Sequence, residues 1–345
     1  MTTVLLDINN LFSRCKYAIK ESNSELYVSL IANGLFSMIK DVMVRFKPDK
    51  YVSFCDGNGS WRKLIYPQYK ANRNKEKTLK EQEQDEVAMN FLRNDFVPFL
   101  KNDTYMPVVD GDLLEADDLI ATYTYMFPDE CCIICSTDGD FLQLLNDKIC
   151  LYNSMENRFV TNKGVYDTTT GKKIGFTLKD GKIHVGKEVC FLSEGENAVP
   201  MDNWIDYCLF VKCIRGDKSD NILSAYPRVP EKSSKNKIGL LEAFISKTGD
   251  GFAYNSLMNS TWKDLLGNEH IVQHDFAFNQ LLIDLRQIPS DLRNSAVNII
   301  NAELNKDKPQ QIYKKMLHFF NKFGLERLAE NIDSITKPFI LGSGK

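Results

Sequence analysis

The sequence predicts an α/β protein with a doubly wound, mainly parallel sheet, followed by a helical region. Three short runs rich in β-branched, aromatic and cysteine residues end near acids: TVLL before Asp7, YVSFC before Asp56 and CCIICST before Asp138. Runs of this kind are typical of buried parallel strands. Helical patterns alternate with them through about residue 160, which is the order expected of a doubly wound sheet.

The elements follow from local patterns. The first strand reaches Ile8, and a long amphipathic helix covers residues 25–46, because apolar residues recur there near helical spacing until Pro48. A second strand covers residues 51–55, a polar helix runs from about 79 to 100, and a short strand lies near 107–109. Asp112 and Glu115 have capping-box spacing before Leu119, which places the acids of LLEADDLIAT in the first turn of a helix. Another helix begins near Phe141.

Changes in composition and residue pattern along the chain suggest three regions. We expect a core over residues 1–203, which contains a basic arch at 61–80 and a glycine-rich insertion at 165–197. Alternating stretches such as IGFTL and KIHVG predict β-hairpins in that insertion. A helical region should follow over 204–335, and residues 336–345 form a tail.

Composition limits the function classes. With 345 residues, 43% hydrophobic and 26% charged, the chain has the composition of a globular protein with a full core. The chain has nine cysteines, an odd number. Cys132 and Cys135 have the spacing of a zinc knuckle, but no second Cys or His pair lies at a matching distance, so we expect buried free thiols in a reducing, cytoplasmic setting. The N-terminus lacks an export pattern, and no uninterrupted apolar run approaches ~18 residues, so we expect no membrane contact.

Charge is distributed unevenly. The net charge is only −3, yet basic residues concentrate in two stretches. For a single stretch, a solvated surface would be the better interpretation. Two stretches in a chain that also gathers carboxylates favour a polyanionic partner, because local fields guide association. The stretches contain Arg62, Lys63, Lys70, Arg73, Lys75, Lys77 and Lys80, and then Lys212, Arg215, Lys218, Arg228, Lys232, Lys235 and Lys237.

The acids themselves point to metal ions. In open α/β sheets the active crevice lies at the carboxyl ends of the strands, where Asp7, Asp56 and Asp138 would gather. So many negative charges repel one another unless hard divalent cations neutralise them. Any single aspartate could instead cap a helix or a turn, and we adopt that interpretation for Asp112, Asp202 and Asp206.

Four motifs carry a family resemblance: YPQYKANR, LLEADDLIA, STDGDFLQLL and IRGDKSDN. In this order they resemble the five-prime nucleases, which include flap endonucleases and the five-prime exonuclease domain of bacterial DNA polymerase I. The similarity runs from Asp7 to about Ile335. WRKLIYPQYKANRNK and FGLERLAENIDSI resemble most the branch of the T-even phage ribonuclease H.

The resemblance implies a metal site. It suggests two Mg²⁺ ions, which Mn²⁺ can replace, and two-metal chemistry explains why phosphodiester hydrolysis needs many acids. Asp117 and Asp138 would be catalytic, together with Lys70 and Arg73. The implied metal-site acids are Asp7, Asp56, Glu115, Asp117, Asp118, Asp138, Asp140, Asp217 and Asp220.

The resemblance also implies a DNA-binding set. Lys70 and Arg73 would clamp the scissile phosphate at the base of the arch. Tyr69 would stack on an unpaired terminal base, or it could be a half-buried aromatic beneath the arch. A helix-turn-helix variant would grip the duplex backbone, but only Gly239 remains of its usual glycine-rich turn, so we expect no monovalent-ion site there. The full set is Arg62, Lys63, Tyr69, Lys70, Arg73, Lys218, Lys232, Ser233, Ser234, Lys235 and Lys237.

The implied activity is a metal-dependent, structure-selective 5′-3′ exonuclease and flap endonuclease. It would act on DNA with a five-prime flap, fork or nick and on RNA/DNA hybrids, removing primers or flaps in phage-type replication and repair. We expect a monomer in the cytoplasm, that of the host if the chain is phage-encoded. The tail KPFIL is either a docking peptide for a sliding clamp or single-strand-binding protein, or a frayed end. Two alternatives stay open: a catalytically silent junction-binding module, and a PIN-type ribonuclease on single-stranded RNA.

Overall fold

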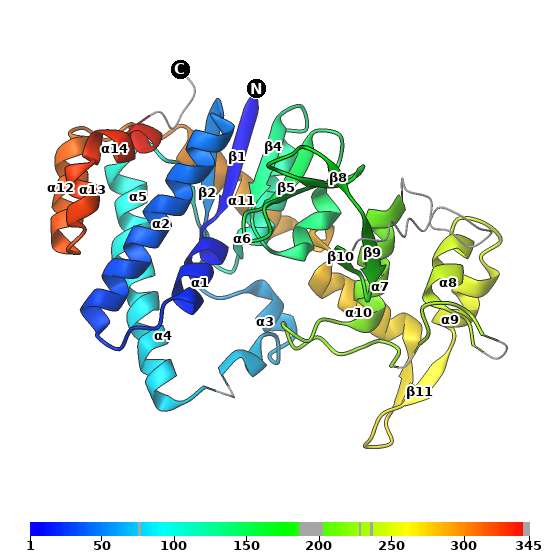
Figure 1. Cartoon of the computed structure of the whole chain (residues 1–345). Coiled ribbons are helices and arrows are strands. Elements are labelled where there is room, and N and C mark those ends of the chain that lie inside the picture. Colours follow the sequence, from blue (N-terminus) through cyan, green and yellow to red (C-terminus); the bar gives the residue numbers. More distant parts are fainter. Residues whose placement is uncertain (75–76, 186–202, 228, 235–236, 341–345) are drawn as a thin grey trace. The chain divides into compact units, whose positions relative to one another are not determined.

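The chain folds as two compact units. The computed structural model describes all residues except 75–76, 186–202, 228, 235–236 and 341–345 (Figure 1). Unit 1 comprises Met1–Trp61, Glu76–Asp138 and Pro289–Lys345, and unit 2 comprises Arg62–Lys75 and Gly139–Ile288. The predicted helical region 204–335 is therefore divided between the two units, because its last helices pack into unit 1.

Unit 1 contains a parallel sheet of four strands in the order β3-β2-β1-β4. Asp7 pairs with Phe54 and Leu6 with Cys135, so the strands end nearly level. This arrangement confirms the predicted parallel α/β sheet and brings the residues that follow each strand to one edge (Figure 1). The strands are β1 (Thr2–Asp7), β2 (Lys50–Phe54), β3 (Val108–Val109) and β4 (Cys131–Cys135).

Helices surround this sheet. The long helix predicted over 25–46 is confirmed, and so is the one predicted over 79–100, which contains a π-helical turn at Leu92–Phe96. The helices are α1 (Ile8–Ala18), α2 (Ser24–Phe46), α4 (Leu79–Phe91), η2 (Leu92–Phe96), α5 (Val97–Asp103), α6 (Ala116–Met126), α11 (Ser290–Leu304), α12 (Ile312–Lys322), α13 (Glu326–Glu330) and α14 (Ile332–Ile340).

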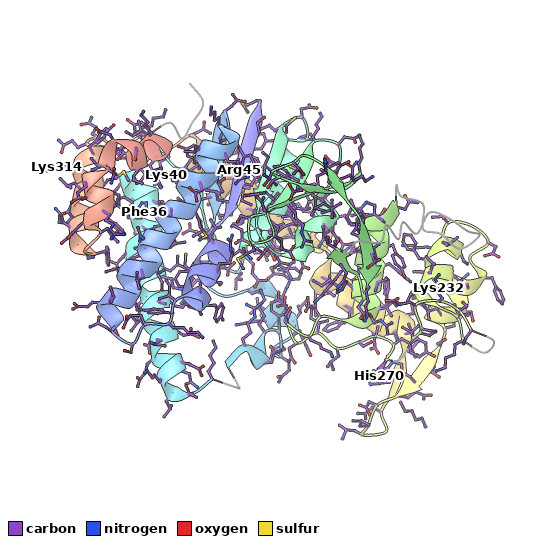
Figure 2. All side chains as sticks on the ribbon, viewed as in Figure 1. Phe36, Lys40, Arg45, Lys232, His270 and Lys314 are labelled. Carbon is purple, nitrogen blue, oxygen red and sulfur yellow. The ribbon has the colours of Figure 1, made fainter. Side chains whose placement is uncertain are left out.

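A cluster of phenylalanines joins α2 to the later helices of unit 1. Phe36 on α2, labelled in Figure 2, is fully buried and packs edge-on against rings from η2, α5, α12 and α14. Centroid distances from Phe36 are between 5.1 and 6.0 Å. Edge-to-face pairs at such distances are favourable and add to the burial of large apolar side chains. The partners are Phe96, Phe99, Phe319, Phe320 and Phe339.

Helix α2 has the length and composition of a helix that could cross a membrane. It has 23 residues, and 44% of its apolar 18-residue stretch is buried inside the structure. The buried face includes Ile31, Leu35 and Ile39, in addition to Phe36. A helix packed in this way is a core helix of unit 1.

Unit 2 contains antiparallel strands and short helices. Strands β5 to β8 form a meander in chain order, and two hairpins, β9-β10 and β11-β12, stand apart from it. The described part of the predicted insertion does form β-strands, and residues 186–197 of it lie outside the described residues. The strands are β5 (Ile149–Asn153), β6 (Arg158–Thr161), β7 (Gly164–Asp167), β8 (Lys173–Ile174), β9 (Phe176–Lys179), β10 (Lys182–Val185), β11 (Thr261–Lys263) and β12 (Glu269–Ile271).

The helices of unit 2 build its apolar core. Tyr207, Phe210 and Ile214 on α7 join Leu240 on α8 and Phe276 on α10 in one cluster of buried residues. Helix α3 (Trp61–Ile65) begins at the last residue of the first unit 1 segment. The others are η1 (Ala71–Asn74), η3 (Gly139–Leu144), α7 (Trp204–Arg215), α8 (Leu240–Ser246), α9 (Phe252–Met258), α10 (Val272–Ile283) and η5 (Leu285–Gln287).

Candidate active site

Asp7 is the most buried of the predicted metal-site acids that end a strand. Only 5% of it is exposed, and its carboxylate accepts hydrogen bonds from the Asn10 backbone N–H at 3.0 Å and the Ser136 hydroxyl at 2.9 Å. Burial, together with the neighbouring charges of Asp56 and Asp138, raises the pKa of Asp7 to about 7, against these two hydrogen bonds. Asp56 and Asp138 therefore both act electrostatically on Asp7.

Asp56 follows β2 and holds the start of α6. Its own backbone N–H donates to Asn9 Oδ1 at 2.8 Å, and its carboxylate accepts from the Ala116 N–H at 3.0 Å. Asp56 is exposed, whereas Glu115, which precedes α6, is only 7% exposed. A carboxylate at a helix N-terminus is favoured by the exposed N–H groups of the first turn.

Asp138 lies in the loop after β4, and Asn10 fixes that loop. The Asn10 side-chain amide exchanges hydrogen bonds with Thr137: Nδ2 donates to Oγ1 at 2.9 Å, and Oδ1 accepts from the Thr137 N–H at 3.1 Å. The Asp138 N–H donates to Ser136 Oγ at 3.1 Å, and that hydroxyl in turn donates to Asp7. The ends of β1 and β4 are thus joined through side chains.

Asp118 has a different environment from the other acids of α6. It is fully buried, and its Oδ2 accepts from the Trp61 indole N–H and the Glu115 backbone N–H, both at 3.1 Å. The capping box predicted for Asp112 and Glu115 is therefore wrong: the helix begins at Ala116, its N-cap is Glu115, and the capping box is formed by Glu115 and Asp118. Asp117 lies in the same turn and is partly exposed.

In unit 2, one lysine connects two of the predicted acids. Lys212 on α7 contacts the carboxylate of Asp140, and its Nζ lies 2.8 Å from Asp217 Oδ2. Burial by itself lowers the pKa of Lys212, but Asp140 and Asp217 outweigh it and hold that pKa well above its ordinary value. Burial by itself raises the pKa of Asp217, but the Lys212 ammonium outweighs it and holds that pKa well below its usual range.

Asp220 pairs with the predicted phosphate clamp. Its Oδ1 lies 2.7 Å from Arg73 Nη2, and its Oδ2 accepts from the Tyr69 hydroxyl at 2.9 Å and lies 4.0 Å from Lys70 Nζ. The Lys70 N–H donates to the Asp220 carbonyl at 2.8 Å. Tyr69 is only 3% exposed, which corresponds to the structural interpretation of this residue and not to an exposed stacking platform.

The other predicted DNA-binding residues that the structure describes are exposed, except Arg62. Arg62 is 2% exposed, and its Nε donates to the Leu282 carbonyl at 2.7 Å, so its guanidinium is part of the interior in this conformation. Lys235 lies outside the described residues. The rest are exposed: Lys63, Lys218, Lys232, Ser233, Ser234 and Lys237.

The structure thus places the predicted residues in two groups, one in each unit. Asp7, Asp56, Glu115, Asp117, Asp118 and Asp138 lie around the strand ends of unit 1, and Lys70, Arg73, Asp140, Asp217 and Asp220 lie in unit 2. Three residues with evident roles were missed: Asn9, Asn10 and Ser136. Polar DINN and CST segments directly after the strands were the available signal.

The donor set suits a hard cation. The acids of unit 1 offer only carboxylate oxygens, which Mg²⁺ and Mn²⁺ prefer. Within the part of the chain that the structure describes, no three His, Cys, Asp or Glu side chains already form a metal-coordinating group. Mg²⁺ usually keeps several of its waters, so carboxylates that contact only those waters are compatible with it.

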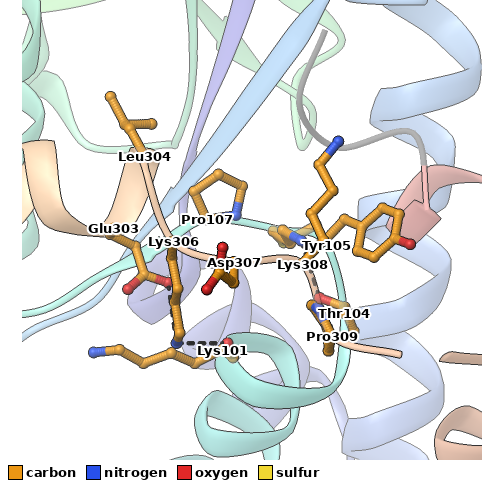
Figure 3. Close-up of a pocket in the computed structure, with 11 residues that line it drawn as sticks. Lys101, Thr104, Tyr105, Pro107, Glu303, Leu304, Lys306, Asp307, Lys308 and Pro309 are labelled. Atoms are coloured by element: carbon orange, nitrogen blue, oxygen red, sulfur yellow. Dashed lines mark hydrogen bonds and ion pairs between the residues drawn. The ribbon is translucent and has the colours of Figure 1, made fainter. Parts of the chain in front are cut away.

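A small surface pocket lies elsewhere in unit 1 and contains none of the predicted site residues (Figure 3). It is bordered by the end of α5, the segment before β3 and the chain after α11. Lys306 closes one side by donating to the Lys101 carbonyl at 2.9 Å. This pocket is not part of the candidate active site.

Comparison with known families adds an independent observation. Residues 2–170 match the family described as 5'-3' exonuclease, N-terminal resolvase-like domain. Over these residues, which are just under half of the chain, it is similar to the five-prime nuclease family. All the predicted acids of unit 1, and Asp140 in unit 2, lie inside the matched segment.

Individual five-prime nucleases are similar over different lengths. The flap endonuclease Xni of Psychromonas ingrahamii is 29% identical over 183 residues, which are 52% of this chain and 64% of that protein. The match therefore spans less than two thirds of that relative.

Solved structures of bacteriophage T5 proteins share the fold. The T5 flap endonuclease in a pseudo-enzyme-product complex with DNA and metal ions has a TM-score of 0.56 at 18% identity, covering 88% of this chain and 99% of its own. The T5 5'-exonuclease with bound zinc has a TM-score of 0.56 at 19% identity, covering 88% and 100%. At these identities the likeness shows the fold alone. The nearer resemblance to the T-even phage branch stays a prediction.

Proposed function

We propose that this chain is a metal-dependent nuclease that removes nucleotides or short flaps from the five-prime ends of DNA and of RNA in RNA/DNA hybrids. The observation that supports it best is the group of Asp7, Asp56 and Asp138 at the carboxyl ends of parallel strands, inside the segment that matches the exonuclease family. The pKa of Asp7 is raised first by burial and then by the charges of Asp56 and Asp138, and a divalent cation would offset both effects.

We assign the metal site to two Mg²⁺ ions, replaceable by Mn²⁺. When bound, such ions supply an ionised water and relieve charge on the leaving oxygen. Asp7, Asp56 and Asp138 would hold the cations or their waters, with Glu115 and Asp117 beside them. Asn9, Asn10 and Ser136 keep these carboxylates oriented through the hydrogen bonds described above, as second-layer partners do in metal sites.

The basic residues would bind the nucleic acid. Lys70 and Arg73, which contact Asp220 in this structure, would exchange that partner for the scissile phosphate, to which arginine can donate two parallel hydrogen bonds. The exposed Lys218, Lys232 and Lys237 would contact the duplex backbone without reading bases, which gives binding that depends on salt and on DNA structure. We further propose that the protein is a monomer and acts in the cytoplasm during phage-type replication and repair. Its protein partner would be a sliding clamp or a single-strand-binding protein.

The test is cleavage of a forked duplex labelled at the five-prime end of its flap. We expect turnover with Mg²⁺ or Mn²⁺, none with chelator, and a loss on the order of 100-fold or more in Asp138→Asn. Asp112→Asn is the matched control, because Asp112 is an exposed acid to which we assign only a turn. Its rate should equal that of the wild type.

Three outcomes oppose the proposal. Turnover in chelator would contradict the metal mechanism. Binding of forks without cleavage under all conditions would indicate the silent junction-binding module. Cleavage of single-stranded RNA alone would favour the PIN-type ribonuclease. An RNA/DNA hybrid labelled at the RNA five-prime end tests the primer-removal part separately.

A further inference from the structure

Lys212 lies between Asp140 and Asp217, two carboxylates that the resemblance to the five-prime nucleases assigns to the metal site. It projects from α7 and contacts Asp140 in η3 and Asp217 in the turn after α7, all within unit 2. The three side chains are between 9% and 18% exposed. At such low exposure an ammonium that meets two carboxylates is screened little by solvent.

The backbone holds Asp217 in this position. The Gly216 N–H donates to the Lys212 carbonyl at 2.8 Å and ends α7, and Gly216 has a φ of 71°, which favours glycine. Asp217 then exchanges backbone hydrogen bonds with Ile222 at 3.0 and 2.7 Å. Its Oδ1 accepts from the Ser219 N–H at 2.8 Å, which leaves Oδ2 directed at Lys212.

One ammonium therefore serves two acids, of which Asp217 is held in position by its backbone and Ser219. Without a cation, Asp140 and Asp217 would each carry a poorly solvated charge that faces the other. Lysine supplies a compact charge on a flexible stem, so it can leave without disturbing the backbone of α7. A divalent ion brings twice the charge to the same oxygens.

We propose that Lys212 is a resident counter-ion, which neutralises Asp140 and Asp217 in the metal-free protein and is displaced when a divalent cation binds there. This inference rests on the proposed metal site. Lys212 should therefore stabilise unit 2 in the absence of metal. Because the same ammonium competes with a divalent cation, it should also weaken metal binding. Lys212 is thus a positioning residue and not a catalytic one.

The test compares wild type with Lys212→Met by thermal unfolding and by calorimetric titration with Mn²⁺. In chelator, the variant should unfold on the order of 5 °C lower, because two acids lose their shared cation. Saturating Mg²⁺ should remove most of that difference. The variant should bind Mn²⁺ at least tenfold more tightly, since no ammonium competes.

Two further variants control the comparison. Lys263→Met removes an exposed lysine of β11 and should match the wild type in both measurements. Lys212→Arg keeps the charge, so it should stay close to the wild type in chelator and bind Mn²⁺ no more tightly, and it provides a folded protein should Lys212→Met not fold. The same melting temperature and Mn²⁺ affinity in wild type and Lys212→Met would overturn the counter-ion role alone. If no variant and no wild-type sample responds to Mg²⁺ or Mn²⁺, the proposed metal site fails instead.

Discussion

Asp7 shows how one residue can favour function over stability. Its carboxylate is buried at the end of β1, and burial, with Asp56 and Asp138 nearby, raises its pKa to about 7 from an ordinary value of 3.8. The folded metal-free protein therefore binds a proton at Asp7 more strongly than the unfolded chain does. This linkage removes stability as the pH rises from about 4 to about 7.

The first prediction concerns Asp7→Asn in chelator. An amide carries no charge and can still cap α1, so at pH 8 the variant should be more stable than the wild type by about 2–4 kcal/mol. The difference should shrink towards pH 5, where Asp7 is protonated in the folded wild type. Urea unfolding at both pH values measures this difference, and a variant that is less stable than the wild type at pH 8 would contradict the unfavourable ionisation of Asp7.

In the wild type, Mn²⁺ affinity should fall as the pH drops below about 7, because protons compete for Asp7.

Asn10 provides the second residue-scale prediction. Its side-chain amide joins the start of α1 to Thr137, which precedes Asp138. Asn10→Ala should therefore leave the loop after β4 less firmly positioned. We expect Mn²⁺ affinity to fall about 10- to 100-fold, as for other partners of metal ligands.

Asn23→Ala is the matched control for Asn10. Asn23 caps α2 through the Leu26 N–H at 2.9 Å, so its loss should lower the free energy of unfolding by about 1 kcal/mol. Its Mn²⁺ affinity should not change. Equal affinities for both variants would show that Asn10 has no positioning role.

At the scale of elements, two loops depend on each other. The loop after β2 meets the loop after β3: the Gly57 N–H donates to the Leu114 carbonyl at 2.9 Å, and the Trp61 N–H to the Leu113 carbonyl at 2.9 Å. A Cβ built on Gly57 would lie 1.7 Å from the Gly111 carbonyl oxygen. Only glycine allows this approach, which sets Asp56 against the start of α6.

Gly57→Ala should therefore destabilise unit 1. A backbone atom cannot give way as the end of a side chain can, so we expect a loss of about 2–4 kcal/mol in the free energy of unfolding. Gly139→Ala is the control, because a Cβ there meets nothing within 4 Å. Urea unfolding should separate the two variants clearly, and similar midpoints would show that the loops can part at little cost.

For the whole molecule, the sequence predicted what local pattern determines. The strands before Asp7, Asp56 and Asp138 were readable because their apolar runs are continuous and end at acids. The long helix 25–46 was readable from its spacing and differs by one residue at its start. The π-helical turn inside the predicted helix 79–100 was not, since no proline or glycine lies in Leu92–Phe96.

Contacts between distant residues could not be predicted. Asn9 and Asn10 reach partners 47 and 127 residues away, and Phe36 packs on rings from the last helices of the chain, so none of these contacts has a local signature. A basic stretch, likewise, does not reveal which lysine faces solvent. Arg62 and Lys212 lie in such stretches, yet one donates to a buried carbonyl and the other holds two acids.

Anomalous diffraction from crystals soaked in Mn²⁺ is the direct test of the proposal that the acids at the strand ends of unit 1 bind divalent cations. We predict a manganese peak bounded by the carboxylates of Asp7, Asp56 and Asp138, which is absent from Asp7→Asn crystals treated alike. Strong peaks that all lie away from these three side chains, or none under conditions that support cleavage, would contradict the account.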